Sequence, residues 1–212
     1  MRLGPAEVRF TDRSDGDFRQ PASTTHVTAD FPWTWLRQVH GADVVVVEEP
    51  GARAGDSADA AIAVVPGAPI AIVTADCAPV VLVDDAGASV AVAHAGWRGL
   101  YDGVLGATVV EMHKRGAGSI SAALGPCIHA GCYEFSDTDL QPMVDRFGAA
   151  VRATSTKGTP SLDMVAAVRA ALEQAEVELV EVVDTCTSCS LDYWSHRARQ
   201  DEQRQATVAW LS

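Results

Sequence analysis

The central part of the chain alternates short aliphatic, β-branched runs with Gly, Pro or Asp. Runs of about four to eight such residues bounded by turn-forming residues are typical of strands. Because these runs contain few polar positions, we predict strands that are buried on both faces. The predicted strands cover residues 43–48, 60–65, 69–74, 79–84, 88–93, 119–124, 178–183 and 206–211.

Two later segments place apolar residues at helical spacing. The first predicted helix covers residues 100–115 and is followed by Gly116, which we expect at its C-terminal cap. The second covers residues 164–175, and Ser161 or Asp163 is expected as its N-cap.

Residues 1–36 show no clear periodicity, and their one strand candidate runs from Val8 to Thr11. Since the strands cluster first and the helices follow in isolation, a regular βαβ repeat is disfavoured. We predict an α+β fold, with residues 1–212 forming a single domain that has a mixed β-sheet, flanking helices and an irregular segment over 1–36.

Composition narrows the function classes. The 212 residues are 48% hydrophobic and carry a formal net charge of −12, so long-range attraction to nucleic acid or to anionic lipid is disfavoured. We expect small-molecule partners, with no nucleic acid, no membrane and no obligatory protein partner. The apolar runs are of strand length, no targeting segment is evident, and five cysteines indicate reduced thiols, so we expect a cytoplasmic protein.

Three residues stand in distinctive contexts: His40 in RQVHGADV, Cys77 in TADCAPVVLV and His94 in AVAHAGWRG. Two imidazoles and one thiolate suit Zn²⁺, and three protein ligands leave a fourth tetrahedral position for water or substrate, as in catalytic sites. The alternative is that the histidines are ordinary loop or core residues and that Cys77 is a small buried hydrophobe.

Two neighbours of these residues carry charge. Asp76 is a candidate general acid or base, although an acidic residue beside a turn is just as often a backbone cap. Arg98 stands at the start of a predicted helix, where it can bind a phosphate or simply offset the excess of acidic residues.

The other four cysteines form two pairs. Cys127 and Cys132 are separated by four residues, and Cys186 and Cys189 by two. This is an irregular match to a structural zinc site. Buried or substrate-lining roles, or redox activity of the second pair, are the alternatives.

The chain from about Arg37 onward resembles the bacterial YfiH-type family, also called laccase-domain or polyphenol oxidase proteins and the peptidoglycan editing factor family. The matching runs are RQVHGADV, ADAAIAVVPGAPIAIVTADCAPVVLV, AVAHAGWRGL, ALGPCIHAGCYEF and DTCTSCSLDYWSHRA. Long runs in a shared order are more specific than a single short motif.

The resemblance implies a zinc ion held by His40, Cys77 and His94. It also implies purine nucleoside phosphorylase activity on adenosine, inosine and methylthioadenosine, with adenosine deaminase activity beside it. As a hypothesis, Asp76 would carry a proton during deamination at the purine C6. The copper-oxidase label of the family fits poorly, because multicopper chemistry needs many more histidines than six.

For phosphorolysis, we expect Arg98, with Arg37 or Arg13, to orient the phosphate. One departure concerns Arg13: family members usually carry a Gly-Gly-Val-Ser run after an arginine near the N-terminus, whereas residues 14–17 here are Ser-Asp-Gly-Asp.

Two other functions use the same residues. Cys77, activated by His94, would be the nucleophile of a cysteine hydrolase or amidase acting on an amide such as one in a peptidoglycan precursor. A protein that binds its ligand without turnover is the third reading.

Overall fold

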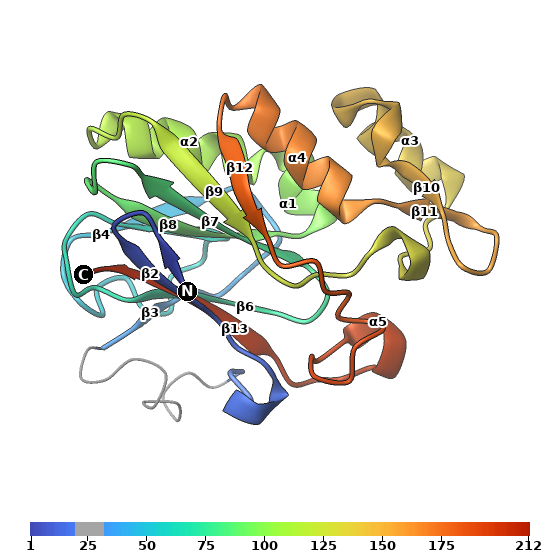
Figure 1. Ribbon diagram of the computed structural model, residues 1–212, viewed down its shortest axis with the longest axis horizontal. Helices are drawn as coiled ribbons and strands as arrows, with labels where there is room; N and C mark the ends of the chain where they lie inside the picture. The colour runs from blue at the N-terminus through green and yellow to red at the C-terminus, as the bar shows by residue number, and fades with distance from the viewer. Residues whose placement is uncertain (20–31) are drawn as a thin grey trace.

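The computed structural model describes residues 1–19 and 32–212; residues 20–31 of the predicted irregular segment lie outside them. Within the described residues, two mixed sheets pack face to face and helices cover the outer face of one of them (Figure 1). The five-stranded sheet has the order β1 (Arg2–Leu3), β2 (Ala6–Phe10), β13 (Gln205–Leu211), β6 (Ile70–Thr74) and β3 (Thr34–Trp35).

The six-stranded sheet contains both parallel and antiparallel pairs. Parallel pairs lie at its two edges, β12 beside β9 and β4 beside β5, and the inner pairs are antiparallel. The order is β12 (Glu178–Val182), β9 (Ile120–Leu124), β7 (Ala78–Asp84), β8 (Val90–Ala95), β5 (Ala60–Ala63) and β4 (Val44–Val47).

Helices and a small hairpin complete the fold. The helices are α1 (Trp97–Asp102), α2 (Val104–Lys114), α3 (Asp137–Phe147), α4 (Met164–Gln174) and α5 (His196–Arg199). The 3₁₀ turns are η1 (Arg13–Asp15), η3 (Ala130–Cys132) and η4 (Ala149–Val151), and the hairpin pairs β10 (Arg152–Thr154) with β11 (Pro160–Leu162). None of the helices within the described ranges is long and apolar enough to cross a membrane.

Strand β7 lies inside the six-stranded sheet, between β9 and β8, and every one of its residues is buried. Val80 and Leu82 pack toward the helices, whereas Val81 and Val83 pack toward the five-stranded sheet. Alternate side chains of one strand therefore join two cores, as expected where successive residues point to opposite faces. This confirms the predicted strand buried on both faces and the α+β class. The prediction of one mixed sheet differs from the structure, in which the predicted strands are divided between two sheets.

The helices differ from the prediction at α1, α2 and α3, and the four-residue helix α5 was not predicted either. The predicted helix over 100–115 is broken at Gly103, whose φ of 94° is left-handed, so α1 and α2 are separate. Helix α3 was not predicted, although Ser136 caps it and buried apolar residues recur along it, because Pro142 interrupts helical hydrogen bonding and obscures the pattern. Asp163, not Ser161, is the N-cap of α4.

The N-terminal segment is more regular than predicted. Strands β1 and β2 pair with each other, and β2 also pairs along β13 near the C-terminus. The pairing of β2 with β13 joins residues near opposite ends of the chain, so no local sequence pattern predicts it.

Candidate metal centre

The register of β7 against β8 brings two of the three candidate ligands together. Pro79 lies opposite His94 and Ala78 opposite Ala95, so Cys77, the residue before β7, lies beside the end of β8. The loop that carries His40 completes the group: the ligand atoms of His40, Cys77 and His94 all lie within 4.8 Å of one another. Residues far apart in sequence thus form one cluster.

His94 is held by a buried carboxylate that the sequence analysis did not single out. Its Nδ1 atom lies 2.8 Å from Oδ1 of Asp59, a fully buried residue directly before β5. The Asp59 carboxylate also accepts the backbone N–H groups of Val39, His40 and Gly41. An acidic residue at the edge of a buried strand was the available signal, and carboxylate partners of this kind orient histidine ligands.

Gln38 fixes the loop of His40 from the other side. Its side-chain amide donates to the backbone oxygen of Val73 and accepts from the backbone N–H of Val73, both at 2.8 Å. The loop is therefore anchored to β6 by Gln38 and to β5 by Asp59. His40 itself has a φ of 61°, a left-handed conformation that is uncommon outside glycine.

The residues present fit a zinc-type cation. Two imidazoles and one thiolate form a borderline-soft donor set that leaves one tetrahedral position open. Gly96 provides space beside them: a Cβ atom there would lie 3.1 Å from Cδ2 of His40 and 3.2 Å from Sγ of Cys77. A larger residue would displace two of the three candidate ligands.

Electrostatics in the metal-free protein favour a charged pair. Burial opposes the thiolate, but His94 and His40 outweigh it and lower the pKa of Cys77 to about 6. Burial also opposes the imidazolium, but the Cys77 thiolate and Asp59 raise the pKa of His94 to about 9. Cys77 is therefore ready to bind a cation or to act as a nucleophile near neutral pH.

Asp76 lies next to the cluster and is almost fully buried. One carboxylate oxygen accepts the hydroxyl of Thr187 and the other accepts the backbone N–H of Arg197, each at 2.7 Å. It has a φ of 93°, uncommon for a residue with a side chain. Asp76 thus ties the turn of Cys77 to two segments near the C-terminus.

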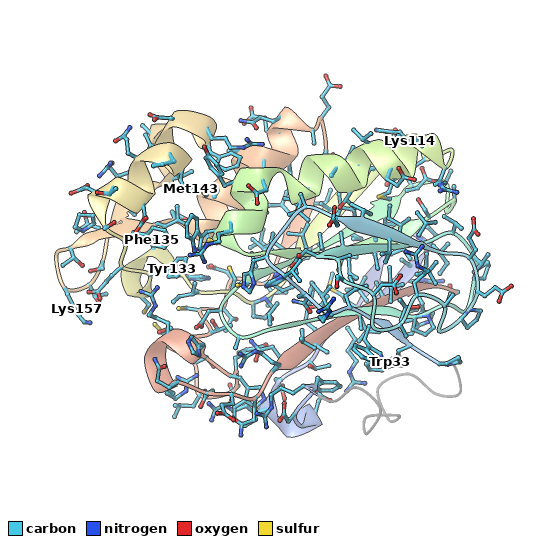
Figure 2. The ribbon with its side chains drawn as sticks, turned by 180° about the vertical axis from the view of Figure 1, so that it is seen from behind. Trp33, Lys114, Tyr133, Phe135, Met143 and Lys157 are labelled. Atoms are coloured by element: carbon cyan, nitrogen blue, oxygen red, sulfur yellow. The ribbon has the colours of Figure 1, made fainter. Side chains whose placement is uncertain are left out.

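The cluster opens into a cleft of about 520 Å³, of the size that holds a small-molecule ligand. Figure 2 shows Tyr133, one of its lining residues, beside Phe135 on the side of the molecule that carries α3 and Met143. The lining residues are Leu36, Gln38, His40, Val73, Thr74, Ala75, Asp76, Cys77, His94, Tyr133, His196, Arg197 and Arg204.

The arginines of the cleft are not those singled out from the sequence. Among the described residues, Arg197 and Arg204 line it. Arg98 is exposed with its guanidinium 4.3 Å from the Trp97 ring centroid, and Arg37 donates to Ser57.

Arg13 is engaged in a separate network. It pairs with Asp201 at 2.7 Å, donates to the backbone oxygen of Tyr193 and lies over the ring of Trp194. Arg13, Arg37 and Arg98 therefore have partners and do not line the cleft, whereas Arg197 lines the cleft although its guanidinium also donates to the backbone oxygen of Glu134.

The chain belongs to the family described as multi-copper polyphenol oxidoreductase laccase, whose sequence model matches residues 17–212. It is 39% identical over 180 residues to a purine nucleoside phosphorylase of Streptomyces coelicolor, covering 84% of this chain and 74% of that protein. It is 34% identical over 182 residues to a purine nucleoside phosphorylase of Mycobacterium tuberculosis, covering 84% and 71%.

Solved structures agree with this assignment. The crystal structure of a Neisseria meningitidis protein matches with a TM-score of 0.84 and 27% identity, over 99% of this chain and 96% of that one. The structure of YfiH from Bacillus licheniformis matches with a TM-score of 0.76 and 25% identity, over 85% and 74%. The predicted membership of the YfiH-type family is thus confirmed, and the relatives' names indicate a phosphorylase-like enzyme.

Proposed function

We propose that this protein is a zinc-dependent purine nucleoside phosphorylase that converts adenosine, inosine or methylthioadenosine to the free base and a pentose 1-phosphate, with adenosine deaminase activity beside it. The observation that carries the proposal is the His40, Cys77 and His94 cluster, which opens into a ligand-sized cleft. The names of the relatives support the choice of reaction.

In this proposal His40, Cys77 and His94 hold the zinc ion, and Asp59 orients His94. When bound, zinc supplies Lewis acidity and lowers the pKa of coordinated water. The chain's own residues bind and orient the nucleoside and the phosphate. The partners are small molecules, and the five free cysteines support a reducing compartment, the cytoplasm.

The cleft offers separate surfaces for the parts of these substrates. Leu36 and Val73 provide an apolar wall for a purine, and Arg197 and Arg204 provide positive charge for phosphate. Burial and the nearby Cys77 charge raise the pKa of Tyr133, so its phenol stays protonated and can donate to a substrate oxygen.

Arg98, Arg37 and Arg13 remain the sequence-based candidates for phosphate, and the cleft geometry favours Arg197 over them. Asp76 remains a candidate proton carrier. Because both of its oxygens accept hydrogen bonds from Thr187 and Arg197, a positioning role is better supported.

The test is a measurement of metal content by elemental analysis, together with chromatography of adenosine incubated with phosphate, with and without a chelator. We expect the His40, Cys77 and His94 cluster to contribute about one zinc per chain, and we expect chelator-sensitive release of adenine, ribose 1-phosphate and inosine. Full turnover after complete metal removal would contradict the proposal.

A second candidate function rests on a specific arrangement. Cys77, His94 and Asp59 form a thiol, imidazole and carboxylate series, since Asp59 binds Nδ1 of His94 and the thiol lies at the same imidazole. This series is used by cysteine hydrolases. A metal-free protein that cleaves an amide of a peptidoglycan precursor and loses that activity on alkylation of Cys77 would support the second candidate.

A further inference from the structure

A second group of thiols lies outside the cleft. Cys132, Cys186 and Cys189 bring their sulfur atoms within 4.8 Å of one another, and the sulfur atoms of Cys132 and Cys189 are 3.2 Å apart. None of the three is among the residues that line the cleft of the first cluster. Two thiolates on a tetrahedral zinc ion with Zn–S bonds of about 2.3 Å lie about 3.8 Å apart, a separation between the 3.2 Å of the Cys132 and Cys189 pair and the 4.8 Å limit of the group.

The three residues come from two segments that the fold brings together. Cys132 ends the 3₁₀ turn η3, whereas Cys186 and Cys189 belong to the CTSC loop. Cys132 and Cys189 are 57 residues apart in the sequence. A Cys-x-x-Cys turn is a recurrent half of structural zinc sites. The irregular spacing of the cysteines in the sequence therefore concealed a compact arrangement in space.

Backbone contacts hold the two segments in place without a cation. The N–H of Thr187 donates to the carbonyl of Cys127 at 3.1 Å, and the N–H of His129 donates to the Cys186 sulfur at 3.4 Å. The N–H of Cys189 donates to the Cys186 carbonyl at 3.2 Å. An N–H directed at a ligand sulfur is the kind of outer contact that orients metal ligands.

Positive charge lies against the same loop. The guanidinium of Arg199 donates to the carbonyl oxygens of Thr187 and Ser188, which lie between the two cysteines of the loop. Arg199 also pairs with Asp201 at 3.0 Å, but Asp201 is shared with Arg13, so these three residues keep one positive charge. This charge partly offsets the negative charge that three thiolates and one divalent cation would leave.

We propose that Cys132, Cys186 and Cys189 form a second metal site, which takes a thiophilic divalent cation of the zinc class. Three sulfur ligands favour zinc over hard cations such as Mg²⁺, and Cys189 is exposed, so a cation can reach the site from solvent. The proposal does not depend on the reaction at the first cluster.

The site would connect two segments that shape the cleft. Tyr133, which lines the cleft, follows Cys132 directly, and Thr187, whose hydroxyl binds Asp76, lies inside the CTSC loop. A cation bound by both segments would fix their separation in the folded protein and stabilise the folded state, because the unfolded chain does not hold the three ligands together. The role of the second metal site is therefore structural, because its ligands do not line the cleft.

The first test compares the metal content of the full-length protein with that of Cys189→Ser. Ser188→Ala is the matched control, since it changes the same loop and leaves all three thiols. The wild type and the control are expected to bind about two zinc ions per chain, one per cluster, and Cys189→Ser about one. Equal zinc content in the wild type and Cys189→Ser would overturn the proposal.

Cobalt substitution gives an independent readout that separates the clusters. The second cluster supplies three thiolates and the first only Cys77, so Cys189→Ser should lose most of the thiolate-to-cobalt charge-transfer absorption. A Cys77→Ser variant should keep most of this absorption, even if its first cluster no longer binds cobalt. The reverse ranking would overturn the proposal.

Thermal unfolding tests the structural role. Zinc added to metal-free Cys77→Ser should raise its Tm, because a ligand of the folded state stabilises it, and the rise should be absent in the Cys77→Ser, Cys189→Ser double variant. The alternative is that Cys132 and Cys189 form a disulfide, which thiol counting on the purified protein detects as the loss of two thiols. A Cys132–Cys189 disulfide in the purified protein, together with no metal binding by the reduced protein, would overturn the proposal.

Discussion

Asp59 Oδ1 lies 2.8 Å from Nδ1 of His94, and both residues are buried. The contact leaves Nε2 of His94 to face Cys77 and His40, so a carboxylate that does not reach the cleft decides which nitrogen is available there. Because the same carboxylate accepts three backbone N–H groups from the loop of His40, one residue aligns two of the three candidate ligands.

Asp59→Asn should therefore weaken zinc binding at the first cluster by about 10–100-fold, the usual effect of removing an outer-shell partner. A zinc titration against a competing chelator measures it. Asp43→Asn is the control, because Asp43 is exposed and contributes its backbone carbonyl, not its side chain, to the fold around Asp59. Unchanged affinity in Asp59→Asn would show that the contact does not orient His94.

Gly96→Ala should disturb metal binding with little effect on the rest of the fold. Its new Cβ would press on His40 and Cys77 at 3.1 and 3.2 Å, and its φ of −65° adds no backbone strain. Gly106→Ala is the matched control: it has nothing within 4 Å and lies inside α2, so it should raise stability by about 0.5–1 kcal/mol. We expect the zinc content of Gly96→Ala alone to fall, and full content there would contradict the geometry.

The pH dependence of the metal-free protein follows from the Cys77 and His94 pair. Since the pKa of Cys77 is lowered to about 6, its contribution to stability is present at high pH and is lost as pH falls through about 6. Since the pKa of His94 is raised to about 9, its contribution is present at low pH and is lost as pH rises through about 9. The ion pair should therefore persist between about pH 6 and 9.

Iodoacetamide labelling of metal-free protein, with Cys77 followed by peptide mass analysis, measures this ionisation. Labelling of Cys77 should already be near its maximum at neutral pH and should be suppressed by zinc. An increase in rate confined to the range of an ordinary thiol, about pH 8.5, would mean that the imidazoles do not stabilise the thiolate.

Arg197→Ala should raise the KM for phosphate in the proposed phosphorolysis by about tenfold or more, the loss expected for one charge-assisted hydrogen bond. The same measurement on Arg98→Ala compares the cleft-lining arginine with the arginine singled out from the sequence. We expect a smaller effect for Arg98→Ala, because Arg98 stacks on Trp97 at the surface. The opposite order would restore Arg98 as the phosphate ligand.

The sequence was sufficient for the strands of the six-stranded sheet and for the identity of the first cluster, but the short strands β1, β3, β10 and β11 were not predicted. Strand positions were predictable because β-branched runs bounded by turn residues reflect burial on both faces, as in β7. His40, Cys77 and His94 were recognisable because each stands in a distinctive local run. Helix α3 was not predicted, because Pro142 obscured its apolar spacing, and the β2 and β13 pairing was missed because it joins opposite ends of the chain.

Tertiary structure decided what lies around those residues. The choice of Asp59 as the partner of His94, of Arg197 as the cleft arginine and of Cys132 as the companion of Cys186 and Cys189 depends on contacts between segments that are distant in sequence. Local patterns report whether a residue is buried and which element it favours, but they carry no information on which distant element packs against it. The sequence by itself determined the chemistry available to this protein, and only the packing of its two sheets determined which groups meet.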